Sequence, residues 1–174
     1  AAEIAPEERI VTVEDSAELR FEGHPHHVRL EARQPGPDGA GGIGLDLLIR
    51  ASLRMRPDRL IVGEVRGPEA YDMLQALNTG HPGSLCTGHA NSPGDMVERI
   101  ITLCMAASRL QYAVVQRMVA SALDLVVHLR RDPDGRRRVD QVVRIVLGQD
   151  GHIRLEPACE AGTGACASLQ EAGA

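Results

Sequence analysis

Short apolar runs alternate along this chain with segments whose apolar residues recur at helical spacing, and this alternation restricts the fold more than any other feature. The runs at 9–13 and 59–63 are rich in aliphatic residues and predict buried strands, and 84–87 predicts a third, short strand. The segments 45–55 and 67–77 predict helices between them. Strands that alternate with helices predict an α/β fold with a mainly parallel sheet, covered by helices on both faces.

Further elements are expected between and after these. A half-exposed strand is expected at 28–32, followed by a flexible loop at 34–42. The second half of the chain predicts the following elements: a helix from about residue 94, a helix at 111–122, and a hairpin of strands 125–129 and 138–147. At 174 residues the chain is long enough for one domain with a real core. Residues 158–174 are mostly Ala, Gly and other small residues, and predict a disordered tail after a domain at 1–157.

Lysine is absent from the sequence, so all 19 basic residues are arginine. The phosphate-loop pattern G-x-x-x-x-G-K-[ST] therefore does not occur in this chain. The net charge of −5 and the aromatic content of 2% disfavour direct binding of nucleic acid, which needs basic patches or stacking surfaces.

Neither cysteines nor histidines show the spacing of a metal site. The four cysteines form no CxxC or Cys/His pattern and predict free thiols. His24, His26 and His27 cluster around Pro25, which is more typical of a solvated loop than of a metal site. No apolar run reaches the roughly 20 residues of a membrane span, and no signal peptide is apparent, so we expect no transmembrane segment and a cytoplasmic location.

Polar side chains follow the predicted strands where each one ends. Glu14 and Asp15 follow the first, Glu64 the second and His89 the third. Reactive groups gather at the carboxyl ends of parallel strands, so these residues predict a common site. A carboxylate such as Glu64 after an apolar strand is typical of a group that holds a magnesium-bound or attacking water, although strands also end in Glu for solubility alone.

Two further observations leave alternatives open. His89 lies near a helix start, where free backbone N–H groups suit an anion, but it could equally be a capped surface histidine. The arginines that flank the Glu64 strand could reach phosphate or a neighbouring subunit, whereas the run 136–138 is typical of a solvated face.

Three segments in order resemble the motifs of one family. Residues 10–19 resemble the acidic Asp box of the type II/type IV secretion ATPase superfamily, 53–67 its Walker B motif, and 79–92 its His box. The residues within these motifs are similar to those of the CpaF/TadA-type branch, which contains the motor ATPases of Flp/Tad pilus assembly and related conjugal-transfer proteins. The resemblance covers roughly residues 1–148.

The resemblance implies a RecA-like P-loop NTPase core that lacks its N-terminal Walker A unit, with 1–157 as the C-terminal part of that domain. It implies a homohexamer that binds ATP with Mg²⁺ between subunits, without a direct protein metal site. Glu64 would be the catalytic carboxylate, and Glu14 would position the metal or the water near it. Contacts near the nucleotide phosphates are implied for further residues: His89, His81, Asp15 and Arg66, the last supporting the Walker B region.

The implied function is a bacterial motor that hydrolyses ATP to drive pilus assembly or type II/IV secretion. Its partners would be inner-membrane pilus or secretion platform proteins, and it would lie peripherally at the cytoplasmic face of that membrane. The Walker A loop of the family would precede Ala1, so we expect this fragment to be inactive alone. Two alternatives remain: an inert ring-interaction fragment, and a conjugal DNA-transfer motor.

Overall fold

A computed structural model describes residues 3–158 of the chain. Contacts divide these residues into two compact units. The first contains residues up to 88 together with 103–109, and the second contains 89–102 together with the residues from 110 onward.

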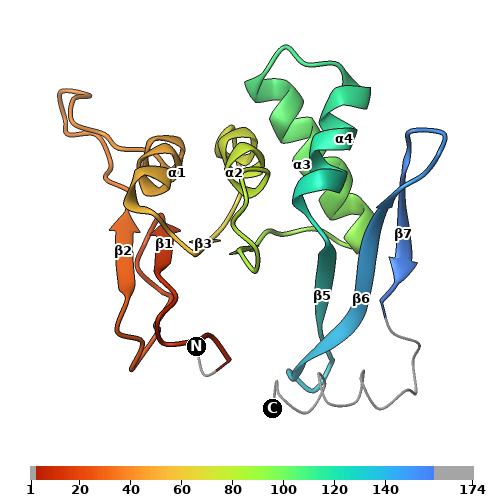
Figure 1. Ribbon diagram of the computed structural model, residues 1–174, viewed down its shortest axis with the longest axis horizontal. Coiled ribbons are helices and arrows are strands. Elements are labelled where there is room, and N and C mark those ends of the chain that lie inside the picture. Colours follow the sequence, from red (N-terminus) through yellow and green to blue (C-terminus); the bar gives the residue numbers. More distant parts are fainter. Residues whose placement is uncertain (1–2, 159–174) are drawn as a thin grey trace. The chain divides into compact units, whose positions relative to one another are not determined.

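The first unit contains a parallel sheet of four strands in the order β2-β1-β3-β4, shown in Figure 1. The strands are β1 (Ile10–Glu14), β2 (His27–Glu31), β3 (Arg59–Val62) and β4 (Leu85–Cys86). Ile10 pairs with His27 on one side and with Arg59 on the other, so the three longer strands begin and end together. Their carboxyl ends therefore form one edge.

Helices cover the apolar face of this sheet. They are α1 (Leu45–Ser52), which continues into the short 3₁₀ helix η1 (Leu53–Met55), and α2 (Glu69–Leu77). Ile49 of α1 and Met73 and Leu74 of α2 are fully buried. Burial of each such side chain contributes about 1.5–3 kcal/mol, so these helices hold the sheet in place.

The other face of the sheet carries polar side chains, because successive residues of a strand point to opposite faces. Val11 and Val13 alternate on β1 with Thr12 and Glu14, which are nevertheless only 0% and 3% exposed. The segment 15–22, which leaves β1 and returns toward β2, contacts this polar face through hydrogen bonds with Glu14. Thr12 and Glu14 are thus buried, whereas their partners on β2, Arg29 and Glu31, stay exposed.

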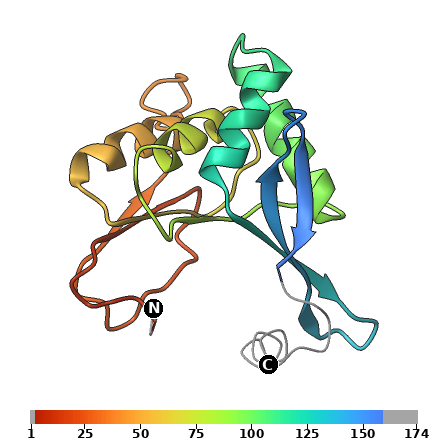
Figure 2. The same cartoon turned by 45° about the vertical axis from the view of Figure 1, so that its right-hand side comes forward.

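The second unit contains α4 (Tyr112–Ala122) and an antiparallel sheet of three strands in the order β5-β6-β7. The strands are β5 (Leu125–Arg131), β6 (Arg137–Leu147) and β7 (Ile153–Pro157). The register shifts between His128 and Leu129. Figure 2 shows the long β5-β6 hairpin and β7 beside it. Helix α3 (Pro93–Ala107) contributes residues to both units.

The predicted α/β class with a parallel sheet and helices is confirmed, and so is the hairpin of β5 and β6. The hairpin belongs to a sheet of its own, and β7 was not predicted, although Ile153 and Leu155 alternate with charged residues there. The predicted tail lies outside the described residues except for Ala158. Within the described part of the chain, no helix combines the length and apolar character that a membrane crossing requires.

Candidate functional site at the carboxyl edge of the parallel sheet

Glu14 and Glu64 lie at the same edge of the parallel sheet. Val13 of β1 pairs with Val62 of β3, and Gly63 N–H donates to the carbonyl oxygen of Val13 at 2.8 Å. Glu14 therefore lies beside Gly63, and Glu64 follows one residue later. The carboxylates come from two neighbouring strands, 50 positions apart in the sequence.

Gly63 leaves the space that the Glu14 side chain occupies. A Cβ atom at position 63 would lie 3.0 Å from Cγ of Glu14 and 3.4 Å from its Cβ. Such a contact is tighter than side chains normally make, so a larger residue would displace Glu14. Glycine at this position leaves room for the Glu14 side chain beside the end of β3.

The Glu14 carboxylate is buried and holds the loop that follows it. Its Oε1 accepts hydrogen bonds from the backbone N–H groups of Glu18 at 3.0 Å and Leu19 at 2.8 Å. These bonds satisfy a buried oxygen that would otherwise lose its hydration without compensation. Glu14 therefore organises the site as well as contributing charge to it.

Glu64 forms an ion pair with Arg66, with 2.6 Å between Oε2 of Glu64 and Nη2 of Arg66. The hydrogen bond and charge of Glu64 raise the pKa of Arg66 above its ordinary value, and the charges of Asp15 and Glu18 add to this effect. The Arg66 side chain is 62% exposed, so the pair adds little stability. Its contribution is to orient Glu64, and the carboxylates of Asp15 and Glu18 lie near the same arginine.

Glu69 supports the turn between Glu64 and α2. Its Oε1 accepts the backbone N–H groups of Arg66 at 2.6 Å and Gly67 at 2.7 Å. Only 8% of Glu69 is exposed. Sequence reasoning did not assign this residue a role, although an acidic residue in the first turn of a helix is a known sign of bonding to backbone N–H groups.

The residues after β4 also reach this edge. Val65 N–H donates to the carbonyl oxygen of Thr87 at 3.0 Å, and the Thr87 hydroxyl donates to the carbonyl oxygen of Gly63. Gly88 is the last residue of the first unit before α3, and His89 begins the second. A contact of His89 with the nucleotide phosphates therefore stays a prediction.

His81 lies at the opposite edge of the sheet. Its Nδ1 is 3.0 Å from the carbonyl oxygen of Ala76, near the end of α2. The Ser84 hydroxyl donates to the carbonyl oxygen of His81 and accepts the N–H of Leu60, at the start of β3. Glu64 follows the other end of that strand, so the structure does not bring His81 and Glu64 together.

The histidines of the 24–27 cluster have separate partners. His24 Nε2 lies 2.6 Å from the carbonyl oxygen of Glu8, and His27 Nε2 lies 3.1 Å from the hydroxyl of Thr12. His26 instead lines a pocket with Arg9 and Arg54. Within residues 3–158, no group of three or more His, Cys, Asp or Glu side chains could hold a metal ion.

The remaining candidates from the sequence have local roles. Cys86 and Cys104 are free thiols, and burial raises the pKa of each to about 11. The other two cysteines lie outside the described residues. Arg138 pairs with Asp132 at 3.1 Å and Arg136 with Asp134 at 3.7 Å, so two of the three arginines at 136–138 pair with carboxylates of their own turn.

Solved structures of ATPases share this fold. The VirB11 ATPase of the Brucella suis type IV secretion system, in complex with sulphate, superposes with a TM-score of 0.70 at 32% identity over 82% of this chain and 42% of its own. The pilus retraction motor PilT with bound ADP superposes with a TM-score of 0.57 at 24% identity, over 95% of this chain and 42% of its own. The chain therefore has the fold of part of a P-loop ATPase domain.

Sequence comparison shows the family. The family model described as "Type II/IV secretion system protein" matches residues 2–173, and the chain belongs to that family. A putative conjugal transfer protein of Mycobacterium tuberculosis is 44% identical over 151 residues, which are 87% of this chain and 42% of the relative. Protein VirB11 of Agrobacterium fabrum is 35% identical over 156 residues, 88% of this chain and 44% of the relative. The chain thus spans less than half the length of these relatives.

Proposed function

We propose that this chain forms the catalytic-carboxylate part of a motor ATPase that drives pilus assembly or type II/IV secretion. The observation that carries the proposal is the placement of Glu14 and Glu64 at one edge of the parallel sheet, with Gly63 between them. Membership of the secretion family and the likeness to the VirB11 ATPase support it.

Glu64 is the proposed catalytic carboxylate. It would accept a hydrogen bond from the attacking water and take up its proton, while Arg66 holds the carboxylate in position. Glu14 would fix the second wall of the site through its bonds to Glu18 and Leu19. The proposed contacts of His89 and Asp15 would lie near the phosphates, with Asp15 acting through the metal because its own charge is negative.

ATP and Mg²⁺ fit these residues in a specific way. Bound Mg²⁺ would neutralise charge on the phosphates of ATP. Glu14 and Glu64 already hold intramolecular partners, which suits contact with a hydrated Mg²⁺ through water rather than direct ligation. Mg²⁺ dehydrates reluctantly and keeps several waters in such sites.

The proposed assembly is a homohexamer that binds ATP between subunits and docks onto inner-membrane pilus or secretion platform proteins, peripheral to the cytoplasmic face of the membrane. The CpaF/TadA branch is the subtype that the motif wording favours. The conjugal transfer relative supports the alternative of a DNA-transfer motor. The net charge of −5 favours protein over DNA as the molecule in direct contact with this chain.

The decisive experiment joins this chain to a P-loop segment and compares ATP hydrolysis with and without Glu64→Gln. Removal of a catalytic proton acceptor commonly costs 10²-fold or more, and we expect a loss of about that size in kcat. Glu7→Gln is the matched control, because Glu7 is an exposed carboxylate before the start of β1. Equal rates for Glu64→Gln and the parent protein would remove Glu64 from the proposed role.

A second candidate function is that of an inert interaction module within a ring. The observation that favours it is the lack of a G-x-x-x-x-G-K-[ST] sequence in these 174 residues. Titration of Mg-ATP into the chain separates the two candidates. Tight binding excludes the inert module, whereas no binding until the P-loop segment is added supports the expectation that this chain is inactive alone.

A further inference from the structure

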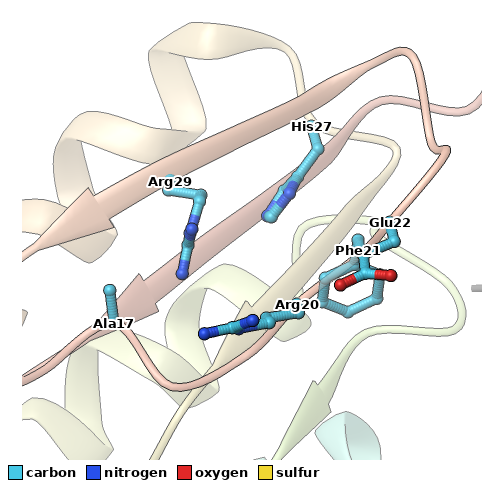
Figure 3. Close-up of a pocket in the computed structure, with 6 residues that line it drawn as sticks. All are labelled: Ala17, Arg20, Phe21, Glu22, His27 and Arg29. Carbon is cyan, nitrogen blue, oxygen red and sulfur yellow. The ribbon is translucent and has the colours of Figure 1, made fainter.

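A pocket of about 420 Å³ lies on the polar face of the parallel sheet, beside the loop that follows β1. Figure 3 shows the residues around it. Its lining residues come from that loop and from β2: Ala17, Arg20, Phe21, Glu22, His27 and Arg29. None of them belongs to the proposed catalytic site.

Two guanidinium groups give this pocket its chemistry. Figure 3 shows Arg20 of the loop and Arg29 of β2 extending toward the same space. Arg29 Nη2 donates to the carbonyl oxygen of Leu19 at 3.0 Å. Neither arginine forms a salt bridge with a carboxylate of residues 3–158, whereas Arg50, Arg130 and Arg154 do. Guanidinium forks without a carboxylate partner match the geometry of an oxyanion.

Phe21 and His27, which line the pocket, contact each other. The rings of Phe21 and His27 meet edge to face with their centroids 5.0 Å apart, and His27 Nε2 lies 3.1 Å from the hydroxyl of Thr12. Burial is the main cause that lowers the pKa of His27, and the charges of Arg29 and His24 lower it further. Arg20 and Arg29 are thus the guanidinium groups that line the pocket, and Glu22 is the carboxylate that lines it.

The pocket also connects with Glu14. Leu19 donates its N–H to Oε1 of Glu14 at 2.8 Å and accepts a hydrogen bond from Arg29 on its carbonyl oxygen at 3.0 Å. Glu14 and Arg29 therefore hold the two successive peptide groups that flank Leu19, so a ligand that engages Arg29 acts next to the peptide group that Glu14 holds.

We propose that Arg20 and Arg29 form a binding site for a phosphate group, separate from the nucleotide site, and that its occupancy changes the order of the loop held by Glu14. The phosphate would lie between the two guanidinium groups, within the space bounded by Phe21 and His27. Inorganic phosphate and a phosphate monoester share this chemistry. The proposal concerns binding and does not depend on ATP hydrolysis.

The test is an NMR titration of the full chain with inorganic phosphate, and separately with glycerol 3-phosphate, at constant ionic strength. We expect saturable shifts of the amides of residues 17–29 in the millimolar range, and a rise of the His27 pKa as the bound anion offsets the charge of Arg29. Slower hydrogen exchange at the Leu19 amide is the expected readout of loop order. Tighter binding of the monoester would identify a phosphorylated molecule as the ligand, and equal binding would identify free phosphate.

Variants make the assignment specific. Arg20→Gln removes a side chain for which no hydrogen bond is seen within the described residues, so the fold should persist while phosphate binding weakens about tenfold. Arg29→Lys retains the charge but loses the fork and should weaken binding by a similar factor. Arg54→Gln, an exposed arginine outside the pocket, should bind as the parent does. Shifts that do not saturate, or that persist equally in Arg20→Gln and Arg29→Lys, would overturn the proposal.

Discussion

Glu69 holds the backbone of Arg66, because its carboxylate Oε1 accepts the N–H of that residue at 2.6 Å. The same oxygen accepts the N–H of Gly67, and a Cβ at position 67 would lie 2.9 Å from Oε2 of Glu69. The turn between Glu64 and α2 is therefore built around a buried carboxylate that faces backbone rather than a ligand.

Replacement of Glu69 tests this arrangement. Glu69→Ala leaves two backbone N–H groups without their acceptor and should lower the free energy of unfolding by about 1–3 kcal/mol. Glu69→Gln keeps an acceptor oxygen and should cost less. Urea denaturation of the chain measures both. If the two variants were equally stable, the hydrogen bonds to Arg66 and Gly67 would not be the reason for the burial of Glu69.

A methyl group at position 63 should disturb Glu14. Gly63→Ala brings a Cβ to 3.0 Å from Cγ of Glu14, and overpacking of this kind costs typically about 1–3 kcal/mol of stability. Gly94→Ala is the matched control. Gly94 lies in α3, and a Cβ at this position would be 3.8 Å from its nearest neighbour, the hydroxyl oxygen of Ser92. We expect Gly94→Ala to be neutral or slightly stabilising. Thermal denaturation of the two variants side by side checks the contrast.

Removal of the Glu14 carboxylate should release the loop that follows β1. Glu14→Ala deprives the N–H groups of Glu18 and Leu19 of their acceptor, so the hydrogen exchange of these two amides should become about tenfold faster. Exchange at Leu60, in the neighbouring strand, serves as the internal control. Unchanged protection at Leu19 would show that the loop is held by other contacts.

Stability should fall in alkaline solution because of the thiols of Cys86, which is half-buried, and Cys104, which is buried. Burial raises the pKa of Cys86 and Cys104 from 9.0 to about 11, so the unfolded chain loses these protons at lower pH than the folded chain. The free energy of unfolding should therefore decrease as the pH rises from about 9 to about 11. The absence of lysine simplifies this window, since only tyrosines titrate alongside the thiols.

Cys104→Ala provides the control for the alkaline measurement. The variant should show a shallower decrease of stability between pH 9 and pH 11, because one of the two thiols no longer titrates. Denaturant unfolding at several pH values gives the slope directly. A slope identical to that of the parent chain would show that the Cys104 thiol does not ionise in this range.

Local patterns predicted the first sheet well. The runs at 9–13 and 59–63 correspond to β1 at Ile10–Glu14 and β3 at Arg59–Val62, because buried parallel strands leave a continuous aliphatic signal. The predicted helix at 45–55 ends as η1, and Arg56 then adopts a left-handed conformation with φ of 52° before Pro57. Proline at 57 explains why the helix cannot continue.

Long-range pairing was less predictable. The sequence offered no local sign that β5 and β6 pair with β7 instead of extending the parallel sheet, because strand partners are chosen by contacts far along the chain. His81 shows the same limit within the proposed site. His81 follows α2, which returns the chain to the amino ends of the strands. His81 and Glu64 are therefore near each other in the sequence but lie at opposite ends of β3.

The alignment of Glu14 with Glu64 could be predicted, since parallel strands end at one edge. The contacts of Glu14 could not. Glu14 bonds to backbone N–H groups and fills the space that Gly63 leaves, and neither contact produces a pattern in the sequence. Glu69 did offer a sign, because it is an acidic residue in the first turn of α2. The roles of the site residues in hydrolysis remain predictions.

The peptide group on either side of Leu19 has a consequence for how the loop moves. The N–H of Leu19 points to Glu14 and its carbonyl oxygen accepts from Arg29, so one residue is fixed from both sides. The two groups belong to successive planar peptide units, which are joined by the two backbone dihedrals of Leu19. The two hydrogen bonds together restrain both dihedrals, and loss of either bond alone should leave one of the two peptide units held.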